Sequence, residues 1–168
     1  RVARREELKD QVGGRRKRFP KYDSYANANN KGKITPAKYT YAKQLTANYF
    51  ETNYYENNNG VYEARKLPLQ ANIYTVFAIS TGDFDHDGKQ DILLAGNTDH
   101  ARIKIGKMDA GYGVLLKGDG KGSYEYVPQL RSGLSGKGCV RDLMKVNGKN
   151  GNQLIFMINN QAPIMYSY

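Results

Sequence analysis

The sequence predicts a mainly β fold of about two four-stranded units, preceded by a short helical or irregular segment. Three observations lead to this prediction. From Phe50 onward the apolar residues follow a period of two, which is typical of strands. Turn sequences rich in Asn and Gly separate the apolar segments. A unit of about 60 residues also recurs along the chain, which indicates a repeat architecture.

Residues 1–50 form the expected helical or irregular segment. Short helices are predicted over residues 3–12, 22–28 and 36–48. The last one begins at an N-cap threonine, Thr35, that is followed by Pro36 at the first helical position. Its apolar stripe consists of Tyr41, Leu45 and Tyr49. We expect this stripe to pack against the β part of the chain.

Positive charge is concentrated in the first segment. The chain has 26 Lys and Arg against 16 Asp and Glu, and residues 1–21 alone carry nine basic and three acidic residues. Such a segment is usually a solvated surface; the alternative is that it binds an anionic polymer or nucleic acid. No helix-turn-helix, RNA-binding or zinc-finger signature accompanies it, so nucleic acid is not the expected partner.

Residues 51–168 hold the predicted strands. The turn Asn57–Gly60 joins the first two, and a second Gly-rich turn, 118–122, makes another hairpin. The predicted strands are 52–56, 61–66, 73–80, 91–96, 113–117, 123–127, 140–146 and 154–158. Asp91–Gly96, with the sequence DILLAG, is an apolar run directly after an acidic loop.

An internal repeat groups these strands. Val76–Asn97 recurs in degenerate form as Val140–Asn160, which predicts two units at about 51–112 and 113–168. Each unit has about four strands, the content of one β-propeller blade. Two blades cannot close a ring. Further blades of a longer parent chain, or another protein, are therefore expected to cover the open sheet edges.

The acidic loop before DILLAG has the pattern of a calcium site. Asp83, Asp85, Asp87 and Asp91 occupy positions 1, 3, 5 and 9, with Gly88 at position 6 and Lys89 at position 7. Carboxylates at alternate positions of such a loop converge, and the carbonyl of Lys89 adds a backbone ligand. Oxygen ligands favour a hard cation, and a flexible sphere favours Ca²⁺ over Mg²⁺. Position 4, His86, faces outward and is not an expected ligand.

Residues Gly82–Asn97 resemble an FG-GAP/VCBS repeat, the unit of integrin α-type β-propellers. Looser matches resemble the C-terminal portion of bacterial VCBS-repeat proteins labelled ASPIC/UnbV or cartilage-acidic-protein-like; they are Arg18–Tyr22, Tyr25-Ala26, Tyr55–Asn57, Leu67–Ala71, Tyr112–Leu116 and Val140–Asp142. The resemblance implies a structural calcium ion held by Asp83, Asp85, Asp87, Lys89 and Asp91. It also implies an extracytoplasmic protein, at the cell surface, associated with the outer membrane or periplasmic.

The expected function is a non-catalytic binding or scaffold module for protein or glycan. The two histidines, His86 and His100, have no Ser or Cys in a nucleophile motif, and the single cysteine, Cys139, excludes an internal disulfide. Asp99 and Asp109 lie outside the loop, and a lone acid on a surface loop is usually just solvated. A two-carboxylate hydrolase is therefore the least favoured alternative. No run of 18 apolar residues occurs, and membrane insertion is not expected.

Overall fold

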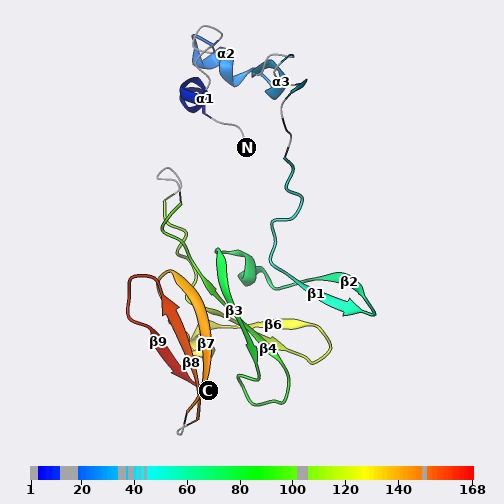
Figure 1. Ribbon diagram of the computed structural model, residues 1–168, viewed down its shortest axis with the longest axis vertical. Helices are drawn as coiled ribbons and strands as arrows, with labels where there is room; N and C mark the ends of the chain where they lie inside the picture. The colour runs from blue at the N-terminus through cyan, green and yellow to red at the C-terminus, as the bar shows by residue number, and fades with distance from the viewer. Residues whose placement is uncertain are drawn as a thin grey trace. The chain divides into compact units, whose positions relative to one another are not determined.

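A computed structural model of the chain describes residues 4–11, 19–33, 37, 40, 41, 43, 45–101, 106–148 and 151–168 (Figure 1). The chain divides into two compact units, Arg1–Asn48 and Tyr49–Tyr168. This division falls close to the boundary expected between the basic segment, 1–50, and the strand region, 51–168.

The described part of the first unit includes the short helices α1 (Arg5–Gln11), α2 (Tyr22–Ala26) and α3 (Asn30–Lys33), and residues 37 and 40 are also helical. Phe19 and Tyr25 are buried, and their rings meet edge to face with centroids 5.5 Å apart. The ammonium group of Lys33 lies 4.4 Å from the centroid of the Tyr25 ring. This aromatic pair forms the small core of the unit. No helix in the described part of the chain has the length and apolar character needed to cross a membrane.

One of the basic residues of this segment, Arg5, has a structural role. Its side chain is buried, and its Nε donates to the carbonyl of Phe19 at 2.9 Å. Nη2 donates to the carbonyl of Pro20, and the guanidinium lies 4.5 Å from the ring centroid of Tyr22. Arg5 therefore joins α1 to the start of α2 and is not exposed to an anionic polymer. The basic run 15–18 lies outside the described residues.

The helix predicted over residues 36–48 does not extend to its expected end. Residues 45–48 have no regular secondary structure, and Tyr41, Leu45 and Tyr49 are 90%, 82% and 69% exposed. A continuous helical stripe of these three residues is therefore not formed, and packing of Tyr41 and Leu45 against the β part stays a prediction. A short helix has to offset the cost of its own nucleation. The expected N-cap at Thr35 lies outside the described residues.

The second unit is mainly β, as predicted. Nine described strands form three antiparallel sheets. The first is the hairpin of β1 (Asn53–Asn58) and β2 (Val61–Lys66), and the second contains β3 (Val76–Gly82), β4 (Asp91–Gly96), β5 (Val114–Gly118) and β6 (Tyr124–Val127). The third contains β7 (Val140–Gly148), β8 (Gly151–Ile158) and β9 (Ile164–Ser167). Two short helical turns, η2 (Leu69–Asn72) and α5 (Gln129–Ser132), lie between sheets in the sequence.

The sheets do not coincide with the two expected repeat units, 51–112 and 113–168. Strands β3 and β4 from the first expected unit pair onward with β5 and β6 from the second, in the order β3-β4-β5-β6. The hairpin β1–β2 remains a separate sheet. Between β2 and β3 the chain contains Pro68 and the helical turn η2, which separate β2 from the next strand. Within each of the two larger sheets, every strand pairs with its neighbour in the sequence.

The sequence repeat nevertheless has a structural counterpart. Strands β3 and β4 pair with a register shift between Val76 and Ala78, and β7 and β8 pair with a similar shift between Val140 and Asp142. In both sheets the next strand, β5 or β9, then adds to the same edge. The first strands of the two sheets, β3 and β7, also contact each other. The two sheets are thus variants of one arrangement, with a fourth strand described only in the first.

The core lies on both faces of the four-stranded sheet. One cluster packs this sheet against β7 and β8; its buried members include Leu93, Leu143, Leu154 and Phe156. A second cluster on the other side joins Ile92, Leu94, Val114 and Leu116 to Ala71 and Tyr74. All six residues of β4 are buried as a result. A strand covered on both faces requires a continuous apolar run, which explains the sequence DILLAG.

Because Tyr74 is buried, the stability of the fold depends on pH in the alkaline range. Its hydroxyl donates to the carbonyl of Leu94 at 2.9 Å, and burial, with a smaller effect of Tyr126, raises the pKa of the phenol well above 10. Because the folded state holds the proton that the unfolded state loses near pH 10, this contribution to stability declines as pH rises above about 10. Tyr74→Phe is expected to cost about 1 kcal/mol at pH 8 and to show a shallower decline up to pH 11. Urea denaturation of both proteins measures this; parallel pH profiles would contradict it.

Candidate metal centre

The acidic loop connects β3 to β4 at the edge of the four-stranded sheet. Gly82 at the end of β3 pairs with Asp91 at the start of β4, and the loop closes between them. His86 and Gly88 have positive φ angles of 60° and 83°. At position 88 this left-handed conformation has no steric cost, because glycine has no Cβ. The local sequence therefore folds back on itself and directs its side chains toward the strand ends.

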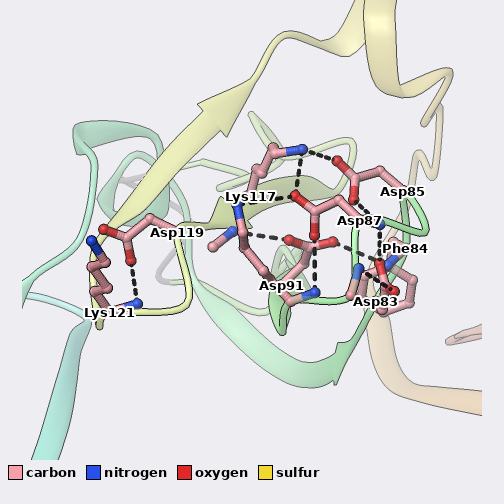
Figure 2. A network of polar contacts seen from close by, with 11 residues as sticks. Asp83, Phe84, Asp85, Asp87, Asp91, Lys117, Asp119 and Lys121 are labelled. Atoms are coloured by element: carbon pink, nitrogen blue, oxygen red, sulfur yellow. Dashed lines mark hydrogen bonds and ion pairs between the residues drawn. The ribbon is translucent and has the colours of Figure 1, made fainter.

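Three of the predicted ligands converge. One carboxylate oxygen from each of Asp83, Asp85 and Asp91 lies within 4.8 Å of the others (Figure 2). Asp91 is 1% exposed, whereas Asp85 is exposed and Asp83 is intermediate. Oxygen atoms at this spacing can contact one hard cation. Within the described residues this is the only such group of His, Cys, Asp and Glu side chains.

Backbone N–H groups hold the carboxylates at the two ends of the loop. Asp83 accepts hydrogen bonds from the N–H groups of Asp87 and Gly88, at 3.0 and 2.9 Å. Asp91 accepts from Phe84 at 3.0 Å and from Gly118 at 2.9 Å. The last bond ties the loop to β5, a strand 27 residues further along the chain. Both side chains are therefore oriented by the fold itself.

The fourth aspartate, Asp87, lies outside this group and contacts two ammonium groups. Its Oδ2 is 2.8 Å from Nζ of Lys117 and 3.6 Å from Nζ of Lys89. Lys117 also pairs with Oδ2 of Asp85. The hydrogen bond from Lys117 is the main cause that lowers the pKa of the Asp87 carboxyl, and the same two carboxylates raise the pKa of Lys117.

Lys117 is a residue that the sequence did not single out. It lies in β5, 32 residues from Asp85 in the sequence, and no local spacing signals the contact. The four aspartates of the loop are subject to mutual charge repulsion. Lys117 relieves part of it, because it is paired with two of them.

The fifth predicted ligand, Lys89, lies in the loop with its N–H bound to Asp87 Oδ1 at 2.9 Å. The role of its carbonyl oxygen as a metal ligand stays a prediction. His86 is exposed, and its ring stacks on Tyr168 with centroids 6.4 Å apart. Phe84 contacts the same tyrosine edge to face at 5.0 Å. These rings attach the loop to the end of the three-stranded sheet.

The degenerate second copy of the loop is much shorter. Asn147 pairs with Asn152 and Gly148 with Gly151, so that only residues 149 and 150 lie between the paired ends of β7 and β8. Asn150 falls outside the described residues. Two connecting residues cannot reproduce the eight-residue path that brings Asp83 and Asp85 to Asp91.

A second polar group of the second unit lies around Asp99. The thiol of Cys139 is the main cause that lowers the pKa of Asp99, whose Oδ1 is also 2.6 Å from Nδ1 of His100. Asp99 and Cys139 border a hollow of about 220 Å³ that Asp109 also lines.

Comparisons with protein-family models, curated proteins and solved structures find no match to this chain. The resemblance to FG-GAP and VCBS repeats therefore depends on the motif in Gly82–Asn97 and stays a prediction.

Proposed function

We propose that the chain is a non-catalytic, calcium-binding β-propeller fragment that acts outside the cytoplasm as a binding or scaffold module for protein or glycan. The observation that carries this proposal is the convergence of Asp83, Asp85 and Asp91 at the junction of β3, β4 and β5. Carboxylate ligands in a flexible, partly exposed loop suit Ca²⁺. The ion would be structural, because Asp91 and Phe84 link the loop to both larger sheets.

The arrangement of the sheets supports the propeller part of the proposal. The order β3-β4-β5-β6 is a four-stranded meander, and a second meander begins beside it. Apolar side chains remain exposed on both larger sheets: Phe77 and Ile79 in β3 are 49% and 61% exposed, and Met157 in β8 and Met165 in β9 are 41% and 61% exposed. Such surfaces are typical of faces that other sheets cover. We infer that further blades of a longer chain, or another protein, are the partners.

The extracytoplasmic location follows from the expected affinity. Two of the loop carboxylates are already paired with Lys117, which leaves fewer free negative charges for an ion. Sites with few free carboxylates fill only at calcium concentrations typical of extracellular modules, about 10⁻⁴ to 10⁻³ M. Such concentrations are found outside the cytoplasm.

Calcium is expected to raise the melting temperature by about 5–10 °C at a concentration 100 times the dissociation constant. Asp85→Ala should abolish this shift and cost no more than about 1 kcal/mol in EDTA, because the side chain is exposed. Differential scanning calorimetry in calcium and in EDTA measures both. Asp109→Ala, which removes an exposed carboxylate outside the loop, should keep the full shift. A wild-type melting temperature unaffected by 10 mM calcium would refute the calcium site.

A further inference from the structure

The four aspartates of the loop differ in whether they contact Lys117. All four accept hydrogen bonds from backbone N–H groups of the chain. Asp85 and Asp87 lie against the ammonium group of Lys117 (Figure 2). Asp85 belongs both to the converging group and to the lysine pair. It is therefore the carboxylate at which a metal ion and Lys117 would meet.

The position of Lys117 is set by the loop itself. The next residue, Gly118, donates its N–H to the buried Asp91, so the backbone of β5 is held against the acidic loop. A side chain at Gly118 would collide with the carbonyl of Gln90, since a Cβ there would lie 2.1 Å from that oxygen. This close approach brings the lysine within reach of Asp85 and Asp87. The contact is thus built into the strand pairing and does not depend on a mobile surface segment.

The charges of the loop also bear on its affinity for a cation. Four carboxylates and the ammonium groups of Lys89 and Lys117 leave two negative charges, which one divalent ion balances. Without Lys117 the loop would carry three. An ion near Asp85 meets a positive charge in contact with the same carboxylate, and like charges at this separation repel. Because the Lys117 side chain is 42% exposed and flexible, it can move into solvent when an ion binds.

We propose that Lys117 is a tethered cation that competes with the divalent ion for Asp85 and Asp87. It thereby sets the calcium concentration at which the loop fills. This inference rests on the proposed calcium binding. At low calcium the ammonium group neutralises the outer half of the loop, and at high calcium the ion displaces it. The loop remains ordered in both conditions, and the cost of displacing Lys117 weakens the apparent affinity.

Isothermal titration of the 168-residue chain with calcium chloride tests the inference. Lys117→Met removes the charge and keeps most of the side-chain length, and it is expected to bind calcium about tenfold more tightly, or better. Lys121→Met is the matched control: it removes the same charge from the neighbouring β5–β6 turn, where the backbone N–H of Lys121 bonds to Asp119. Its affinity should stay within about twofold of wild type, because solvent and salt screen exposed charges.

The direction of the change in calcium affinity shows whether Lys117 competes with the ion or only stabilises the loop. A lysine that only stabilised the loop would make binding weaker when removed, whereas a competitor makes it tighter. Equal affinity of wild type and Lys117→Met, or weaker binding by the variant, overturns the role of Lys117 and leaves calcium binding intact. Absence of binding in wild type and both variants overturns the proposed calcium site itself.

Two further substitutions keep the test decisive if the methionine variant does not fold. Lys117→Gln retains a polar side chain without the charge and should also gain affinity. Lys117→Arg retains the charge and should bind like wild type or more weakly. Circular dichroism of each variant in EDTA checks folding before the titration. An unchanged affinity in a folded Lys117→Gln variant counts against the proposal in the same way.

Discussion

Asn97→Ala is expected to lower the free energy of unfolding by about 3–5 kcal/mol. The Asn97 side chain is 1% exposed. Its Nδ2 donates to the carbonyls of Gly111 and Gly138 at 2.6 and 2.9 Å, and its Oδ1 accepts from the N–H of Gly111 at 2.9 Å. Alanine would remove these partners from the buried N–H and carbonyl groups of Gly111 and would leave the partly buried carbonyl of Gly138 with only the N–H of Val140. Its Cβ would also be strained at the φ angle of 77°.

The chain offers a matched control for this substitution. Asn160 aligns with Asn97 in the sequence repeat and has a positive φ of 55°, but it is exposed. Asn160→Ala should therefore report the backbone strain alone, about 1 kcal/mol. Asn97→Gly should relieve the strain and keep most of the loss. Urea denaturation of the three variants measures the differences, and an equal cost at both asparagines would show that the buried hydrogen bonds contribute nothing.

Asp91→Ala is expected to destabilise the fold even when no divalent cation is present, by about 2–4 kcal/mol in EDTA. The carboxylate is 1% exposed and accepts the N–H groups of Phe84 and Gly118. Its removal leaves the buried N–H of Gly118 and the partly buried N–H of Phe84 without this acceptor, and it detaches the loop from β5. The same substitution also removes one of the three converging carboxylates, so the stabilisation by calcium should be lost as well.

Comparison with Asp85→Ala separates the two roles of these aspartates. Asp85 converges on the same point as Asp91, but it is exposed and pairs with Lys117 on the surface. Its removal should matter mainly in calcium, whereas removal of Asp91 should matter in calcium and in EDTA. Chemical denaturation under both conditions measures this. If Asp91→Ala unfolds at the wild-type urea concentration in EDTA, the buried carboxylate does not hold the loop to β5.

Local sequence was sufficient to predict most of the strands. The bounds of β2 and β4 are those predicted, Val61–Lys66 and Asp91–Gly96, because hairpin turns and apolar runs are encoded within a few residues. Strand β9 was missed. With four residues after Pro163 it is too short to show a period of its own, and only its pairing with β8 makes it a strand.

Local sequence also overstated the length of one helix. Thr35-Pro36 and the spacing of Tyr41 and Leu45 favour a helix up to residue 48, but such signals decide little for a short helix, because its nucleation is costly. Residues 45–48 are accordingly irregular and exposed. The sheet boundaries could not be predicted from the repeat for a different reason. A repeat shows which segments are alike, but it does not show which strand edges pair.

The sequence by itself determined the mainly β class, the acidic loop and the residues that the loop offers to a cation. These are properties of neighbouring residues, set by turn geometry and by the alternation of side chains. Only the tertiary structure decided that Asp87 turns away from the converging group, that Lys117 lies against it, and that Asn97 joins two distant loops. Those contacts span 30 residues for Asp87 and Lys117, 32 for Asp85 and Lys117, and 41 for Asn97 and Gly138. Pairing of strands and packing of sheets create them, and no local pattern encodes which strand will be the neighbour.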